Sequence, residues 1–191
     1  MTRLLRGEEF DAKFEQFRSS VFRLETLQVY RGSGEDDAIA AFTAGLAAPP
    51  ADPVQDDWEA MIRAHVRAGR VMRRVHVVTE PVTDYMQFEL TWAYAPNAAA
   101  GEDIRIVPVR GADWPAGLPR LDFWLFDDAE LFVAHYAPDG TWLGVEPVDD
   151  PARVATARRW RDTALQLAMP WRDYIAEWPE LAARIPAGIR G

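Results

Sequence analysis

One stretch, residues 121–148, constrains the fold of this chain more than any other, with the sequence LDFWLFDDAELFVAHYAPDGTWLGVEPV. On an extended chain, alternate side chains from Leu121 to Phe126 point to opposite faces, and each face receives large apolar groups. A strand with two apolar faces is typical of the centre of a sheet that is covered on both sides. We therefore expect a central strand here, with helices elsewhere in the chain to cover it.

Two further apolar runs follow that strand, 131–136 and 142–145, on either side of Pro138, Asp139 and Gly140. Proline presets φ, aspartate hydrogen-bonds within its own turn, and glycine tolerates positive φ. The pattern predicts a β-hairpin directly after the central strand.

A strand, helix, strand unit precedes this region. The runs Val71 to Val78 and Ile104 to Val109 are rich in β-branched residues, and Thr83 between them is suited to cap a helix. Such a unit favours two parallel strands. We expect a parallel core formed by 71–78, 104–109 and 121–127, with the hairpin extending the sheet.

The whole chain, residues 1–191, fits one α/β domain. The fold class predicted is a mixed central sheet covered by helices on both faces, with a C-terminal hairpin and helices. The other expected elements are an N-terminal helix within 1–18, a strand within 21–30, helices at 35–46 and from Asp56 or Asp57 onward, and C-terminal helices within 150–180.

Composition excludes several classes of protein. Cysteine is absent, which removes disulfides, thiol nucleophiles and thiolate metal sites. The formal charge of −9 argues against direct binding to a nucleic acid. No apolar run reaches the ~20 residues that cross a bilayer, and the charged N-terminus is unlike a signal peptide. We expect a cytoplasmic protein without a membrane contact, and the sequence leaves its oligomeric state open.

The sequence contains few combinations of residues that could form a catalytic site. The three serines lie outside a nucleophile motif, and no glycine pattern resembles a phosphate-binding loop. His135 with Asp127 and Asp128 is the best metal-binding or acid–base set available, and Glu80 and Asp127 each follow a predicted strand, where ligand crevices form. Acidic pairs in an acidic chain are more often solvated turns. We therefore predict no catalytic residue, no metal and no cofactor.

Charged residues within apolar runs indicate a different kind of site. Arg74, Glu89 and Arg105 lie among core positions, and Tyr85 accompanies Glu89 on one helix. One interpretation is internal ion pairing, such as Arg74 with Glu89, because an unpaired buried charge is costly. The other is an arginine-lined pocket, formed by these four residues, that binds a small anionic ligand or a peptide carboxylate.

The phrases SVFRLETLQVY, RVHVVTEPVTDYMQFEL, AGEDIR and LPRLDFWLFDD together resemble an actinobacterial family of unknown function that carries the motif DFWLFDD. Its members are often found beside helix-turn-helix regulators, which implies a partner of that class. A more distant similarity links the chain to the phospholipase D-like fold, in which a strand, helix, strand unit also precedes a DF-x-L-x-D strand and a hairpin. The His-x-Lys motif of that fold is absent, since Tyr136 and Ala137 follow His135, so the resemblance implies no phosphodiesterase activity.

These observations favour a non-catalytic regulatory domain that binds a ligand or a protein, as the partner of a helix-turn-helix transcriptional regulator. A sheet scaffold rich in aromatic residues suits a binding surface. The alternative is a hydrolase that uses carboxylates and histidine, with metal assistance, at His135, Asp127 and Asp128.

Overall fold

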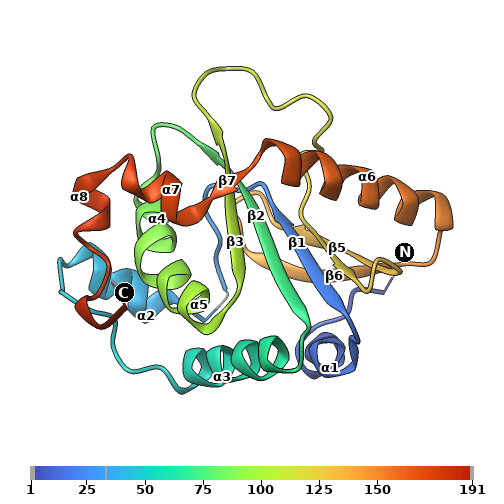
Figure 1. Ribbon diagram of the computed structural model, residues 1–191, viewed down its shortest axis with the longest axis horizontal. Coiled ribbons are helices and arrows are strands. Elements are labelled where there is room, and N and C mark those ends of the chain that lie inside the picture. The colour runs from blue at the N-terminus through green and yellow to red at the C-terminus, as the bar shows by residue number, and fades with distance from the viewer. Residues whose placement is uncertain (1–2, 33, 190–191) are drawn as a thin grey trace.

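A seven-stranded mixed sheet runs through the computed structural model, which describes residues 3–32 and 34–189 (Figure 1). The strand order is β6-β5-β4-β1-β2-β3-β7. The strands are β1 Ser20–Glu25, β2 Val71–Thr79, β3 Asp103–Val109, β4 Phe123–Phe126, β5 Glu130–Tyr136, β6 Trp142–Val148 and β7 Met169–Pro170. The α/β class and the mixed sheet are therefore confirmed, as is the hairpin of β5 and β6.

The helices differ in how their N-termini are capped. They are α1 Glu8–Gln16, α2 Asp36–Thr43, α3 Pro53–Arg67, α4 Asp84–Phe88, the π-helical turn η1 Glu89–Ala93, α5 Tyr94–Ala100, α6 Pro151–Leu167, α7 Trp171–Ala176, α8 Pro179–Ala182 and the 3₁₀ turn η2 Ala187–Ile189. Thr83 caps α4, as predicted, and Asp150 caps α6, whereas α3 is capped by Asp52 and begins earlier than expected. In the part of the chain that the structure describes, no helix combines the length and apolar character of a membrane span.

The strand β4 has the predicted central position but the opposite direction. It lies between β1 and β5 and is antiparallel to both, so the parallel core consists of β1, β2 and β3. The prediction of a parallel strand at 121–127 was wrong. Residues 110–122 form a loop that arches over the sheet without a helix, whereas a parallel return needs a crossover connection, usually a helix (Figure 1).

The first strand is shorter than the predicted 21–30 because side chains replace the ladder after Glu25. The backbone N–H of Thr26 donates to Asp122 Oδ1 at 2.8 Å. Two residues later, the side-chain amide of Gln28 donates to the carbonyl of Val77 at 2.8 Å and its oxygen accepts from the N–H of Thr79 at 2.8 Å. These bonds satisfy the backbone of a turning chain that no longer pairs as a strand.

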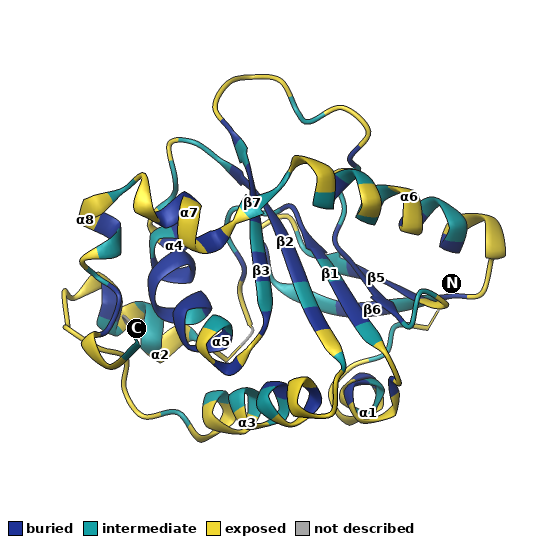
Figure 2. Cartoon of the chain, in the orientation of Figure 1, coloured by how far each residue is buried: buried dark blue, intermediate teal, exposed yellow. Residues whose placement is uncertain are grey.

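Helices cover both faces of the sheet, as predicted, but unequally. On one face, within the part of the chain that the structure describes, α6 is the helix that covers the sheet, and its Val154, Ala157 and Ala164 pack on apolar residues of the strands. On the other face α1 and α3 cover one end with an aromatic cluster, and α2, α4, α5 and α7 cover the other end. Figure 2 shows that the strands between these layers are mostly buried, whereas the outer side of α6 is exposed.

Both edge strands of the sheet have features that hinder pairing with a strand of another chain. Leu5 exchanges two backbone hydrogen bonds with Val145 of β6, at 2.8 and 3.0 Å, and the other edge is the two-residue strand β7, which ends in Pro170. The N-terminal helix predicted within 1–18 is α1. The helices predicted within 150–180 are α6 and α7, and α8 begins with Pro179 at the end of that range.

Candidate functional site

Arg74 of β2 is enclosed by carboxylates of the protein itself. Its side chain lies on the α4–α5 face of the sheet, and the residue is only 5% exposed. Nε donates to Glu102 Oε1 at 2.9 Å, and Nη1 donates to Glu25 Oε2 at 3.2 Å. The predicted pair with Glu89 is present but longer, at 3.9 Å. The interpretation as internal ion pairing therefore describes Arg74 better than an open anion pocket does.

Glu89 is buried in the same network, at the start of the π-helical turn η1. Tyr85, one turn earlier, donates its hydroxyl to Glu89 Oε2 at 3.3 Å. Burial, reinforced by the negative charges of Glu35 and Glu25, raises the pKa of Glu89 well above its ordinary value. A protonated carboxyl at this position can itself donate a hydrogen bond, which an ionised one cannot.

His76 and Tyr94 continue the network toward β1. The ring nitrogen Nε2 of His76 lies 2.7 Å from the carbonyl of Leu27, which can only accept, so Nε2 carries a proton. Burial lowers the pKa of His76 and favours the neutral ring, whose Nδ1 then accepts. The Tyr94 hydroxyl donates to Glu25 Oε2 at 3.1 Å and lies 2.6 Å from Nδ1 of His76, so two acceptors share its single proton.

The charges of the network nearly balance. Burial disfavours an ionised Glu25, but the positive charges of Arg23 and Arg74 outweigh it and hold the pKa of Glu25 at about 2. Burial raises the pKa of Asp122, against the effect of hydrogen bonds from Tyr30 and Thr26. Two arginines thus face the carboxylates, while two other buried acids, Glu89 and Asp122, are shifted toward the neutral form. This cluster is a closed structural core rather than a ligand pocket.

Arg105 is not part of this network. The register of β2 and β3 pairs Arg74 with Ile104 and Val75 with Arg105, which puts the Arg105 side chain on the α6 face of the sheet. There Nε donates to Asp103 Oδ1 at 3.0 Å. The structure therefore brings together Arg74, Tyr85 and Glu89, but it separates Arg105 from them by the thickness of the sheet.

The residues of the hydrolase alternative lie apart. Asp127 follows β4, which is antiparallel, so it lies at the amino end of β1 and away from Glu80. Burial opposes its ionisation, but backbone N–H groups of Ser20, Ser19 and Arg18 donate to it and hold its pKa at about 2. Asp127 therefore anchors the entry into β1.

His135 and Asp128 are equally committed to other contacts. Asp128 forms an ion pair with Arg161 of α6. His135 lies five residues beyond Glu130 along β5, about 16 Å at the usual rise per residue, and its Nε2 lies 3.0 Å from Glu146 Oε2. Among residues 3–32 and 34–189, no three His, Cys, Asp or Glu side chains group closely enough to hold a metal ion.

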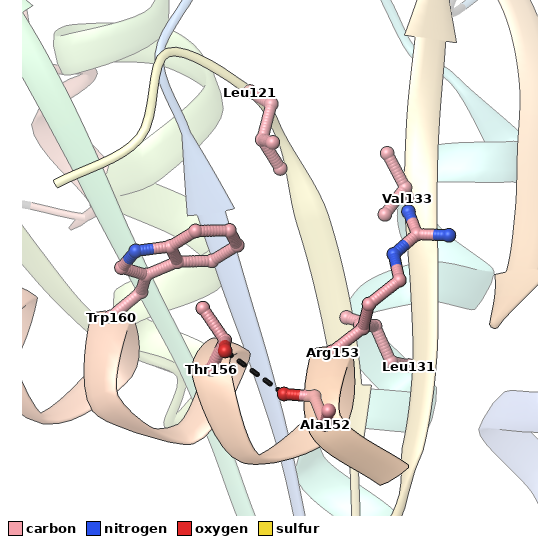
Figure 3. A pocket seen from close by; sticks show the side chains of 7 residues that line it. All are labelled: Leu121, Leu131, Val133, Ala152, Arg153, Thr156 and Trp160. Carbon is pink, nitrogen blue, oxygen red and sulfur yellow. Dashed lines mark hydrogen bonds between the residues drawn. The ribbon is translucent and has the colours of Figure 1, made fainter. Parts of the chain in front are cut away.

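A hollow of about 200 Å³ lies between α6 and the outer strands of the sheet (Figure 3). We call it the α6 hollow, and it is lined by Leu121, Leu131, Val133, Ala152, Arg153, Thr156 and Trp160. Figure 3 shows the Trp160 ring on one side, Arg153 on the other and Leu121 above them. Arg153 is the one charged residue in this lining, so the hollow combines an apolar interior with a guanidinium at its rim.

The rim of the α6 hollow continues onto β5 and β6. Arg153 Nη1 donates to Glu146 Oε1 at 3.1 Å, and the other oxygen of Glu146 contacts His135. The hydrogen bond from Arg153, and further that from His135, lower the pKa of Glu146. The Thr156 hydroxyl donates to the carbonyl of Ala152 at 2.9 Å and accepts from Arg159 at 2.8 Å. Arg153 is therefore the side chain of the lining best placed to bind a charged ligand group.

Comparison with protein-family models matches residues 8–176 to a domain of unknown function, DUF6879. The chain belongs to this family. A search of curated proteins found no match. The matched span of the DUF6879 domain begins at the first residue of α1 and ends at the last residue of α7, so it contains both the buried network and the α6 hollow.

Several residues of the DUF6879 domain that organise these two regions escaped the sequence analysis. The sequence pattern does not single out Glu102 or Asp122, and both are buried in the network. Their roles depend on the register of β2 with β3 and on the direction of β4. Trp160 and Arg153 lie at helical spacing on α6, and only the placement of α6 over the sheet reveals that both line one hollow.

Proposed function

We propose that this protein is a non-catalytic binding domain that regulates a helix-turn-helix transcription factor by direct contact. The resemblance to a family found beside such regulators supports the choice of partner. Contact with a transcription factor also requires a cytoplasmic location, which is part of this proposal. The structural feature that supports the proposal is the surface formed by α2, α3 and the loop between them.

This surface, residues 35–59, concentrates the negative charge of the chain. Between Arg31 and Arg63 the sequence contains seven acidic residues and no lysine or arginine, against a net charge of −9 for the whole protein. Two large apolar side chains are exposed within it, Leu46 at 52% and Val54 at 76%. Figure 2 shows the loop between α2 and α3 as exposed along most of its length. We call residues 35–59 the acidic surface.

The acidic surface suits a cationic protein partner. Proteins that bind DNA carry clustered lysine and arginine, and complementary charge accelerates and orients association. Exposed apolar side chains such as Leu46 and Val54 supply contacts that exclude water at the centre of an interface. A DNA duplex, by contrast, would be repelled by the acidic surface. The protein would therefore bind the regulator without itself binding DNA.

The test is co-purification of this protein with the helix-turn-helix regulator encoded next to it. We expect a complex whose affinity falls as salt is raised, because the contact is electrostatic. The double variant Asp36→Asn/Asp37→Asn should weaken the complex by about tenfold. The matched control Glu15→Gln/Asp149→Asn removes two exposed acids elsewhere and should leave affinity unchanged. Absence of a complex, or equal weakening by both double variants, would refute the proposal.

A further inference from the structure

The α6 hollow has the walls and the rim of a small-molecule site. Leu131 and Val133 of β5 form its floor, and the Trp160 ring, which packs 6.1 Å from the ring of Phe123, forms a fixed wall. A flat apolar group can lie against an indole ring and gain both contact area and ring-to-ring attraction. The hollow is thus preformed by residues that the core of the sheet holds in place.

Its size limits the ligand to a small body. The hollow measures about 200 Å³. An apolar cavity of about 150 Å³ accepts benzene. The α6 hollow therefore fits one substituted ring, or a branched hydrocarbon of similar volume, and is too small for a nucleotide or a long acyl chain.

The charge at the rim selects the polar group of that ligand. Arg153 is 49% exposed at its side chain, and the bond to Glu146 uses Nη1. A guanidinium carries five N–H donors in a planar fork, so the remaining edge can bind a carboxylate through two hydrogen bonds. The helix around it reinforces this preference, because Arg153, Arg158, Arg159 and Arg161 all lie on α6, with Asp162 as its acid.

We infer that the α6 hollow binds a small carboxylic acid, with its ring or branched apolar body between Trp160 and Val133 and its carboxylate on Arg153. This site is separate from the acidic surface, since one lies on the α6 face and the other on α2 and α3. The inference therefore stands or falls independently of the proposed contact with a regulator.

Titration calorimetry with phenylacetate tests the site, with phenylacetamide as the neutral ligand of the same shape. We expect phenylacetate to bind about tenfold or more tightly than phenylacetamide, because the amide loses the charge-assisted hydrogen bonds. Arg153→Gln should weaken phenylacetate binding by about tenfold and leave phenylacetamide unchanged. The matched control Arg67→Gln, on α3 beneath the other face of the sheet, should change neither.

A second variant blocks the hollow. Ala152 is exposed at its mouth, and Ala152→Trp places a ring there without altering the core, so it should abolish binding of both ligands. Each variant is first shown to unfold at the same urea concentration as the wild type. If Ala152→Trp does not fold, the inference is tested with Arg153→Gln alone. The inference is overturned if wild-type protein does not bind phenylacetate, binds acid and amide equally, or binds as well when the hollow is blocked.

Discussion

Replacing Glu89 by glutamine should make the protein less sensitive to rising pH. Glu89 is buried between Tyr85 and Arg74, and burial together with the charges of Glu35 and Glu25 raises its pKa. In the unfolded chain the same carboxyl ionises near pH 4.3. Folding therefore takes up a proton at every pH between the unfolded and the folded pKa. Glutamine fills the same space without a proton to take up.

The magnitude follows from the linkage between proton binding and folding. When the folded state binds one more proton than the unfolded state, the free energy of unfolding falls by about 1.4 kcal/mol per pH unit as pH rises. Because the pKa of Glu89 is raised on folding, its contribution to stability is fully present below the unfolded pKa. This contribution is lost as pH rises toward the folded pKa. The variant Glu89→Gln should therefore gain about 1.4 kcal/mol per pH unit relative to wild type across this window.

Urea unfolding at several pH values above 5, followed by tryptophan fluorescence, measures this difference. His76 contributes the opposite slope below its unfolded pKa, since burial lowers its folded pKa, but it does so equally in both proteins. The difference between variant and wild type therefore isolates Glu89. If the free energies of unfolding of the two proteins change in parallel across the pH range, Glu89 is ionised in the folded state, contrary to our reasoning.

A control of opposite sign is available at Glu102. This carboxylate binds Arg74 through two hydrogen bonds, at 2.9 and 3.4 Å. Glu102→Gln removes a charge that compensates a buried guanidinium, so it should destabilise the protein by about 3–5 kcal/mol. The pair of variants thus separates a buried acid that opposes folding at neutral pH from one that supports it.

Two further predictions concern the sheet. Asp127→Asn should destabilise the protein by about 1 kcal/mol at pH 7 because it weakens charge-assisted bonds at a half-exposed site. Since the folded pKa of Asp127 is about 2, that deficit should shrink as pH falls below about 4, and a constant deficit would contradict it. Phe123→Ala should cost about 3–5 kcal/mol, against less than about 1.5 kcal/mol for Phe123→Leu, in urea unfolding. Equal losses would show that β4 is not central to the core.

Local patterns predicted the elements of this fold, but not the direction of its central strand. The alternation in 121–126 indicates a strand with two apolar faces, and β4 has them. The same alternation results whether such a strand runs parallel or antiparallel to its neighbours, because side-chain period does not depend on direction. The absence of a helical pattern in 110–122 was the available indication, since a parallel return would need a crossover.

The sequence predicted those residues of the buried network that stand out within their own segment. Arg74 and Glu89 stand out as charges among apolar neighbours, and the structure places both in one network. The principal partners of Arg74, Glu25 and Glu102, come from another strand and a loop, so their roles depend on sheet register. Arg105 could not be assigned to a face from its own segment, because that face is fixed by which residue of β2 lies beside it.

The buried network and the apolar face together explain how the register of the parallel core is selected. Replacing a buried ion pair by apolar residues is often stabilising, so the network contributes more to specificity than to total stability. Arg74 reaches Glu25 on β1, Glu102 before β3 and Glu89 on η1. A slip of β2 by one residue would turn Arg74 to the α6 face, away from Glu25, Glu102 and Glu89, and would bury Val75 among the charges of the network. The network therefore holds the three parallel strands in register from one face. On the other face α6 needs only to cover apolar side chains, which leaves room beside Trp160 for the α6 hollow.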